Sequence, residues 1–298
     1  MLSLANPTLR LFIGAALISL SPVWVNLVSV SATTSAFWRL AIGGMVLAVF
    51  LLVTRRRLQF SARIWQVLGL AALFIALDMW FYHRSIQLIG PGLSTLIANF
   101  QVFVMAAAGF IILRQLPSRQ QLIAIPMAFL GLSLIVGVDW NSLPENYRLG
   151  IVFGLGAAVT YAGYLLSMRR SRRDSRNRVP SREIAVISLL GAAMLGAAAL
   201  VEGESLAIGS AGDAAWLVCY GVLSHSIGMM FIASSLPHVT TTQAGLALLL
   251  QPTLSFVWDV LFFARPMSAT ELLGAIIALF AIYLGSRGRS EQVERTGK

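Results

Sequence analysis

Long runs of apolar residues alternate with short polar connections along the whole chain. A helix needs about 20 predominantly apolar residues to cross the hydrocarbon core of a bilayer, and ten segments reach roughly that length. They are residues 9–29, 34–53, 64–85, 92–113, 120–138, 149–168, 183–201, 213–234, 242–263 and 270–286. Because backbone polar groups must be satisfied within lipid, the pattern predicts an all-α polytopic membrane protein with ten transmembrane helices.

The composition supports this prediction and excludes other classes. Of the 298 residues, 57% are hydrophobic and only 11% are charged, which is too little charge to cover the surface of a soluble protein. The net charge of +10 would suit nucleic acid, but the basic residues lie in short clusters between apolar runs, so we expect no nucleic-acid partner. The single cysteine, Cys219, excludes an intrachain disulfide. The N-terminal apolar run, Leu11 to Val30, exceeds a signal-peptide core and predicts a first transmembrane helix.

The positions of the arginines predict the orientation in the membrane. With both termini in the cytoplasm, 18 of the 22 basic residues fall on the cytoplasmic side, and Arg39, Arg84, Arg148 and Arg265 fall at the outer side. The densest cluster, RRSRRDSRNRVPSR at 169–182, is most simply a determinant of topology, although it would also suit anionic lipid or RNA. We predict a multi-pass protein of the cell inner membrane with both termini cytoplasmic.

The two halves of the chain match weakly at an offset of 150 residues. Gln251 falls on Gln101, and Ser268 falls on Ser118. Each half has five predicted spans, so two halves that fold alike must have opposite orientations in the membrane. Inverted repeats are a recurring transporter design, with the substrate site near the midplane. The predicted division is a first five-helix repeat at 1–138, an external connecting loop at 139–148, a second five-helix repeat at 149–286 and a basic cytoplasmic tail at 287–298.

Polar and aromatic side chains within the spans mark a candidate site, because buried polar groups are costly in a membrane. Neutral groups such as Asn99 and Gln251 suit the polar end of a zwitterionic substrate without the cost of a fixed buried ion pair. Aromatic rings suit an aromatic side chain, although core packing would explain such rings equally well. The candidate substrate-binding residues are Trp24, Asp78, Trp80, Tyr82, His83, Thr95, Asn99, Gln101, Tyr161, Ser224, His225 and Gln251.

Two pairs of residues leave alternatives open. Asp78 and His83 would carry a proton if transport is proton-coupled, but His83 equally suits a structural role, bonded to a backbone carbonyl. Pro22 and Pro252 each remove a backbone N–H from a helix. The carbonyl that each proline leaves free must find water, a side chain or a substrate group, unless the proline only kinks the helix for packing.

Enzyme signatures are absent from the sequence. It contains no HExxH, no GxSxG and no Walker A motif, so we predict neither enzymatic activity nor ATP-driven pumping, and no cofactor or metal. The remaining classes are a secondary transporter and a channel or scaffold without carrier activity. A channel would not need the five-plus-five repeat, and a scaffold would not need so many buried polar groups.

Several stretches resemble a known family. FYHRSIQLIGPGLSTLIANFQ at 81–101, TTTQAGLALLLQP at 240–252, and the turns LPSRQQLIA and PMSATELLG before the last helix of each half resemble the EamA type of the drug/metabolite transporter superfamily. The resemblance covers nearly the whole chain and is strongest to bacterial exporters of aromatic amino acids. Many relatives have a glutamate where Arg114 and Ala264 stand here, so no role of that glutamate is carried over.

The resemblance implies a function and a site. It implies export of aromatic and other neutral amino acids across the inner membrane by alternating access, by a protein that works as a monomer within the lipid bilayer, with protons as a possible coupling ion. It also implies a central cavity between the third, fourth, eighth and ninth helices and parts of the first and sixth. The alternative within the family is export of another small metabolite or drug.

Overall fold

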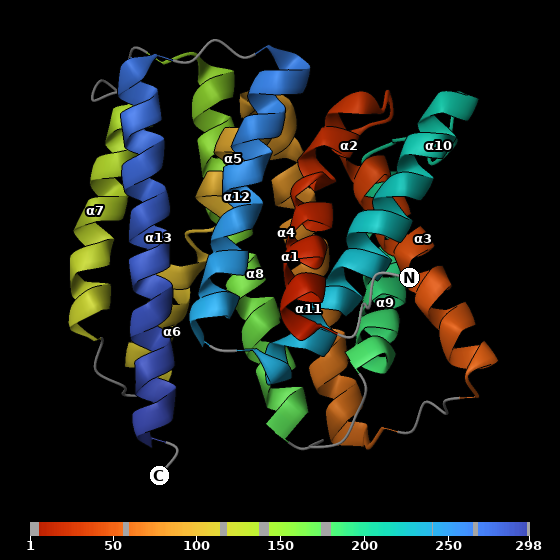
Figure 1. Ribbon diagram of the computed structural model, residues 1–298. Coiled ribbons are helices and arrows are strands. Elements are labelled where there is room, and N and C mark those ends of the chain that lie inside the picture. The colour runs from red at the N-terminus through yellow and green to blue at the C-terminus, as the bar shows by residue number, and fades with distance from the viewer. Residues whose placement is uncertain are drawn as a thin grey trace.

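The described part of the chain is helical throughout. The computed structural model describes residues 6–55, 60–113, 118–136, 143–173, 180–239, 241–264 and 268–296, and no strand occurs among them. The elements in chain order (Figure 1) are α1 (Pro7–Ser19), α2 (Ser21–Leu27), α3 (Ala32–Val53), α4 (Ala62–Ile89), α5 (Pro91–Ala98), α6 (Gln101–Leu113), α7 (Arg119–Val136), α8 (Glu145–Arg173), α9 (Pro180–Val201), α10 (Ala211–Cys219), the π-helix η2 (Tyr220–Gly228), α11 (Met229–Ser235), the 3-10 helix η3 (Leu236–His238), α12 (Thr241–Phe263) and α13 (Ala269–Thr296).

The helices account for the ten predicted spans. Within the described residues, seven helical stretches are long and apolar enough to cross a membrane, and three shorter apolar helices fall within α7, α12 and α13. The all-helical, polytopic prediction is therefore confirmed. Three spans are interrupted, however: the first between α1 and α2, the fourth between α5 and α6, and the eighth by η2. The predicted tail is also different, because α13 stays helical beyond residue 287 to Thr296.

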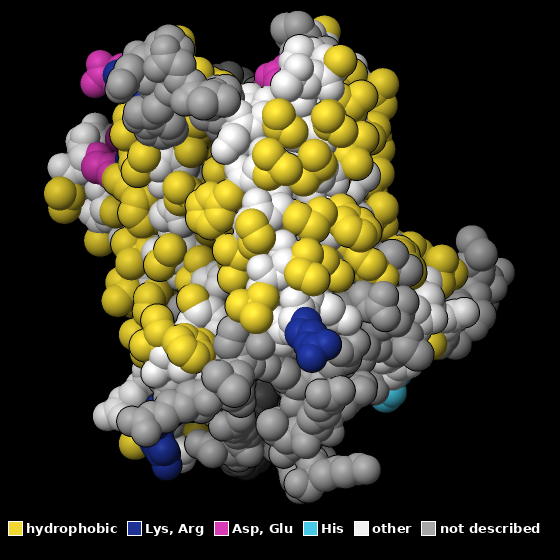
Figure 2. Space-filling view, turned by 90° about the vertical axis from the view of Figure 1, so that its left-hand side faces the viewer, with side chains coloured by type: hydrophobic (Ala, Val, Ile, Leu, Met, Phe, Trp, Pro, Cys, Tyr) yellow, Lys and Arg dark blue, Asp and Glu magenta, His cyan; other side chains and the backbone are white. Residues whose placement is uncertain are grey.

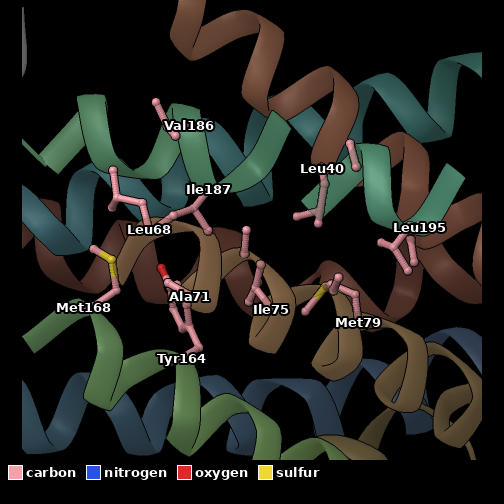
Figure 3. Packing of buried hydrophobic residues seen from close by; sticks show 14 of the residues in the cluster. Leu40, Leu68, Ala71, Ile75, Met79, Tyr164, Met168, Val186, Ile187 and Leu195 are labelled. Carbon is pink, nitrogen blue, oxygen red and sulfur yellow. The ribbon is translucent and has the colours of Figure 1, made fainter. Parts of the chain in front are cut away.

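The main core joins helices from both halves of the chain. Helix α4 packs along α8 and α9, and α3 packs along α9. Figure 3 shows Leu40 of α3, Ile75 of α4, Tyr164 of α8 and Ile187 of α9 converging in one cluster of buried side chains. Since α3 and α4 precede the middle of the chain and α8 and α9 follow it, neither half has this core to itself.

Helices α7 and α13 form a second packed pair at the left of Figure 1. Glycines bring their backbones together: a Cβ atom at Gly131 would lie 2.7 Å from the backbone nitrogen of Ala278, and one at Gly274 would lie 2.7 Å from the carbonyl oxygen of Gly131. Close approach at small residues is typical of helix pairs in membranes.

The helices α7 and α13 begin with the same capping arrangement. The Ser118 hydroxyl accepts from the backbone N–H of Gln121, whose side chain accepts from the N–H of Ser118. Ser268 and Glu271 make the same reciprocal pair before α13. These capping boxes lie in the two turns that carry the family resemblance. In each, the serine and the glutamine or glutamate three residues later satisfy backbone N–H groups that have no partner within the helix.

The surface agrees with a membrane protein. Figure 2 shows a broad band of hydrophobic side chains over the face on the left of Figure 1, with charged side chains above and below the band. Phe129, Leu130, Ile276 and Phe280 are among the large exposed apolar side chains of α7 and α13. Such a surface suits lipid and not water, so the chain is a multi-pass membrane protein. Arg56, Arg57, Arg114, residues 139–142 and residues 174–179, on which the predicted orientation partly depends, lie outside the described residues.

Candidate substrate cavity

A cavity of about 670 Å³ lies between helices of the two halves, within the usual size range of small-molecule sites. Two of its lining residues, Arg169 and Leu236, are exposed, so the cavity reaches the molecular surface where α8 ends. This is the lower end in Figure 1, where the C-terminus also lies. We call it the Arg169 end, and the opposite end, where α9 ends, the Glu202 end. Toward the Glu202 end the lining residues Arg39 and Asp78 are buried.

The cavity brings together eight of the twelve predicted site residues. These are Asp78, Tyr82, Thr95, Asn99, Gln101, Tyr161, His225 and Gln251. The other four, Trp24, Trp80, His83 and Ser224, do not line it, because each is held by a contact described below.

The break in the fourth span places two of these residues. At the end of α5 the Asn99 side chain donates to the Thr95 carbonyl at 2.8 Å, and the Phe100 N–H bonds to Ile97 and not one residue further back. The chain therefore turns more tightly before α6 begins at Gln101. Regular helical spacing puts Gln101 well round the helix from Asn99, but after the break both line the cavity. Gln101 Oε1 is buried and has no hydrogen-bond partner among the described residues.

The corresponding glutamine, Gln251, lies in a helix without a break. The sequence predicted a freed carbonyl or a packing kink at Pro252, and α12 runs as one helix from Thr241 to Phe263 with Pro252 buried inside it. The interruption is instead in the span that has no proline at the matching place. The two glutamines thus approach the cavity from differently built helices.

The break in the first span is stabilised by side chains of the second half. Pro22 follows the break at Leu20. The sequence predicted a free carbonyl at Ile18, but that oxygen accepts from the N–H of Leu20. The carbonyls that side chains satisfy are those of Leu17, from Ser224 Oγ at 2.7 Å, and Ser19, from Ser255 Oγ at 3.0 Å.

Ser224 and Trp24 are hydrogen-bonded to each other, and Ser224 is also bonded to the backbone. Trp24 Nε1 donates to Ser224 Oγ at 3.2 Å, and the Trp24 ring stacks on Trp216 with centroids 5.5 Å apart. Both side chains hold the broken first span and neither lines the cavity, so the predicted contact with substrate remains a prediction.

The π-helix η2 presents His225 to the cavity. Ser188 Oγ donates its single proton to the Ile184 carbonyl at 2.7 Å, so it accepts from His225 Nε2, also at 2.7 Å. This assigns the proton of a neutral His225 to Nε2 and leaves Nδ1 as an acceptor. Nδ1 is buried without a partner among the described residues, on a side chain that lines the cavity. Short π-helical segments are frequent at functional sites.

Arg39 is a cavity residue that the sequence assigned to another place. Its place near the start of a span assigned it to the outer membrane face, but it is only 7% exposed and lines the cavity. Arg39 Nη1 donates to the Tyr220 hydroxyl at 2.7 Å, and the guanidinium lies 4.7 Å from the centroid of the Tyr220 ring. The cavity therefore contains a cation as well as Asp78, in addition to the neutral groups that the sequence predicted. The available signal was an arginine several residues inside an apolar run.

Hydrogen bonds continue from Tyr220 to His83. The Tyr220 hydroxyl, which accepts from Arg39, donates to His83 Nε2 at 3.0 Å, and His83 Nδ1 donates to the Met79 carbonyl at 2.7 Å. Both ring nitrogens of His83 are thus engaged, and neither faces the cavity. This arrangement is the structural alternative that the sequence left open for His83.

Polar contacts close the Glu202 end. The Glu202 carboxylate accepts from Thr33 Oγ1 at 2.6 Å, from Trp80 Nε1 at 2.7 Å and from Arg84 Nη2 at 2.9 Å to each oxygen. The Arg84 guanidinium lies 3.8 Å from the Trp80 ring centroid. We call these four residues the Glu202 cluster; Trp80 belongs to it and not to the cavity. Partial burial raises the pKa of Glu202. The hydrogen bonds from Thr33 and Trp80 and the charge of Arg84 lower it by more than burial raises it, so the net pKa is below the ordinary value.

The segment after α9 is bound to the start of α3 by further hydrogen bonds. They join the first half of the chain to the second across the Glu202 end. The bonds run from Ser31 Oγ to the Glu204 carboxylate, from Thr34 Oγ1 to the Ser205 carbonyl (2.9 Å), from Trp38 Nε1 to the Leu206 carbonyl (3.0 Å) and from the Ser29 N–H to Asp213 Oδ1 (2.8 Å).

Comparisons with known proteins point to a transporter family. The model of the EamA-like transporter family matches residues 7–137 and again residues 148–287. A similar protein, the uncharacterized transporter YwfM of Bacillus subtilis strain 168, is 25% identical over 270 residues, which cover 88% of this chain and 87% of that protein. A protein of known crystal structure has the same fold, with a TM-score of 0.67 and 17% identity over 95% of this chain and 98% of its own.

Proposed function

The chain belongs to the EamA-like transporter family, and from that premise we propose that it exports neutral amino acids, aromatic ones among them, across the cell inner membrane. The observation that carries this proposal is the division of the cavity. Its deeper part holds charged and hydrogen-bonding groups such as Arg39, Asp78 and Gln101, whereas the part toward the Arg169 end is lined by Met168, Ile184 and other apolar side chains. A molecule with a polar head and an apolar side chain fits that division.

The apolar part favours a large and variable side chain. Three tyrosines, Tyr82, Tyr161 and Tyr164, provide rings for aromatic contacts. Methionine is flexible and fills irregular spaces, which suits a cavity that accepts more than one side chain. The lining methionines are Met79, Met105, Met168 and Met229.

We propose alternating access as the mechanism. If both termini are cytoplasmic, the Arg169 end faces the cytoplasm, and the conformation described is the inward-open one that loads substrate for export. The Glu202 cluster must then come apart in the outward-open form, while the Arg169 end closes. Rocking of two repeats around a midplane site is the general design of such carriers.

Three observations support the inverted repeat within this proposal. The family model matches the chain twice, and the capping boxes at Ser118 and Ser268 are 150 residues apart. Helix pairs also correspond: α4 of the third span packs on α8 of the sixth, and η2 and α11 of the eighth pack on α1 of the first.

Proton coupling belongs to the same proposal, with Asp78 as the carrier. Of the two groups that the sequence favoured, Asp78 lines the cavity and His83 does not. Efflux measured with and without a pH gradient decides the question, because equal rates in wild type would leave Asp78 with no coupling role.

Substrate counterflow in proteoliposomes tests the function. We expect exchange of aromatic and other neutral amino acids, and a reduced rate for Gln251→Leu with normal membrane insertion. Gln66→Leu is the matched control, because Gln66 is exposed on α4 and does not line the cavity. Normal exchange by Gln251→Leu would remove Gln251 from the site. Exchange of other metabolites but no amino acid would favour the alternative substrate class, and flux without exchange would indicate a channel.

A further inference from the structure

An arginine and an aspartate line the cavity without an ion pair between them. Arg39 of α3 and Asp78 of α4 are 7% and 4% exposed and both line the cavity. No ion pair within 4.0 Å joins these two described residues. Charges buried within a membrane are costly and rarely occur without a partner. Two such side chains that line one cavity without an ion pair between them therefore point to a ligand that supplies their missing partners.

The Arg39 guanidinium is held in one orientation. Its Nη1 is fixed by the Tyr220 hydroxyl, which His83 and the Met79 carbonyl fix in turn. Its Nε is buried and has no partner among the described residues. A guanidinium carries only donors, arranged in a planar fork that matches a carboxylate. The Arg39 side of the cavity therefore offers a preoriented carboxylate site.

The groups that complement Arg39 are acceptors. Asp78 is an acceptor when ionised, and Gln101 Oε1 and His225 Nδ1 are acceptors that are buried without partners among the described residues. All three side chains line the same cavity. A primary ammonium has three donors and no acceptor, so it would satisfy Asp78 and balance the carboxylate charge.

We propose that Arg39 binds the carboxylate and Asp78 the ammonium of a zwitterionic α-amino acid, with Tyr220 and His83 as positioning residues for Arg39. This inference rests on the proposed function and names the substrate class that its site selects. A substrate that carries both charges compensates both residues and adds no net charge to the site. A ligand with one charged end leaves either Arg39 or Asp78 uncompensated in a low-dielectric cavity, which is strongly unfavourable.

Three probes with the same ring separate the two ends: L-phenylalanine, 3-phenylpropanoate without the ammonium, and 2-phenylethylamine without the carboxylate. Each analogue is added as a competitor of phenylalanine exchange in proteoliposomes. For the wild type we expect half-inhibition by either analogue only at a concentration about tenfold or more above that of phenylalanine, since a charged hydrogen-bonding pair is lost in each case.

Two variants should change this selectivity in opposite directions. Arg39→Gln should remove most of the discrimination against 2-phenylethylamine, and Asp78→Asn should remove most of the discrimination against 3-phenylpropanoate. Arg148→Gln is the matched control, because Arg148 does not line the cavity, and it should keep the wild-type order. General damage to the protein would weaken all three probes together and would not produce this crossed pattern.

Tyr220→Phe tests the positioning role. The ring that packs against Arg39 remains, but the hydroxyl that fixes Nη1 is lost. We expect the half-saturation concentration for phenylalanine to rise about fivefold, with the maximal exchange rate and the inhibition by 2-phenylethylamine unchanged. A fall in maximal rate alone would contradict positioning of Arg39 by Tyr220.

Ligand protection of the purified wild-type protein tests the need for both charged ends without any variant. Phenylalanine should raise the thermal unfolding midpoint, and neither analogue should do so at the same concentration. If all three probes compete and stabilise equally while amino acids are exchanged, the zwitterion inference is wrong and the proposed function stands. If the wild type exchanges no amino acid, both are wrong.

Discussion

The Glu202 end and the Arg169 end of the bundle are built on different principles. Directional polar contacts close the Glu202 end, with four hydrogen bonds converging on one carboxylate. The Arg169 end is hollow, and apart from Arg169 it is lined by apolar side chains such as Met168, Ile184 and Leu236. The Arg84 and Glu202 side chains are 18% and 26% exposed, so water moderates the strength of their ion pair. Under the proposed alternating access, the contacts at the closed end are weak enough to break when that end opens.

The core between the two ends has neither polar contacts nor a cavity lining as its main feature, but apolar packing. The cluster around Leu40, Ile75 and Ile187 is apolar and lies between helices of both halves. Apolar packing is non-directional, whereas each contact of the Glu202 cluster depends on the geometry of one donor and one acceptor. The following substitutions test this contrast between the two ends.

Removing the acceptor should have the largest effect. Glu202→Ala leaves Thr33, Trp80 and Arg84 without their shared partner, and we expect the closed form of this end to lose about 1–2 kcal/mol relative to the open form, or about fivefold to thirtyfold in population. An Asn99→Cys reporter in a Cys219→Ser background should then react faster with a membrane-impermeant thiol reagent added outside intact cells. Glu145→Ala, at another exposed glutamate, is the control and should leave the rate unchanged. An equal rate in Glu202→Ala would show that this cluster does not close the cavity.

Removing a single donor should have a smaller effect in the same direction. Thr33→Val keeps the size of the side chain and deletes one hydrogen bond to Glu202, which is typically worth about 1 kcal/mol. The labelling rate of the same reporter should rise less than in Glu202→Ala. In the double variant, Thr33→Val should add nothing to Glu202→Ala, because the bond is already lost; additive effects would contradict a shared cluster.

Acidification should act on the Glu202 end only at low pH. Since the folded pKa of Glu202 is below its ordinary value, its contribution to stability is complete above about pH 4.3, the ordinary glutamate pKa, and is lost as pH falls through the lowered value. The difference in thermal midpoint between wild type and Glu202→Gln should therefore be constant from pH 8 to about 5 and shrink below about 4. A difference that changed near pH 7 would point to a different group.

A substitution at the Arg169 end should have the smallest effect on closure. Met229→Ala enlarges the apolar part of the cavity and touches no contact of the Glu202 cluster. We expect labelling of the reporter from outside to stay within about twofold of wild type, while half-saturation for large side chains changes through lost packing. A large increase in labelling would mean that a substitution at the Arg169 end changes the closure of the Glu202 end.

Much of the site followed from the sequence, and the exceptions have a common cause. Asp78, Asn99, Gln101 and Gln251 were predicted because polar groups in apolar runs need a wet or paired environment, and all four line the cavity. Helical spacing could not place Gln101 correctly, because it assumes an unbroken helix and the chain turns at Asn99. Their roles in substrate binding remain predictions.

The residues that sequence reasoning misassigned differ in what they contact. Ser224 looks like a site residue, but it satisfies the Leu17 carbonyl, which is free only because the first span breaks. Arg39 looks like an outer-face arginine, because counting charges by loop and span says nothing of the direction in which a side chain points. Tyr220 and Glu202 gain their roles only from partners more than 100 residues away.

The sequence by itself determined the helical bundle, the number of spans, the capped starts of α7 and α13 and the family. These properties depend on local features: the length of an apolar run, a serine three residues before a glutamine or glutamate, and motifs within one segment. Tertiary structure alone decided where the helices break, which polar groups were left unpaired at the cavity and which end was closed. Those outcomes depend on hydrogen bonds and packing between distant segments, whose free energies are realised only when the helices are in contact.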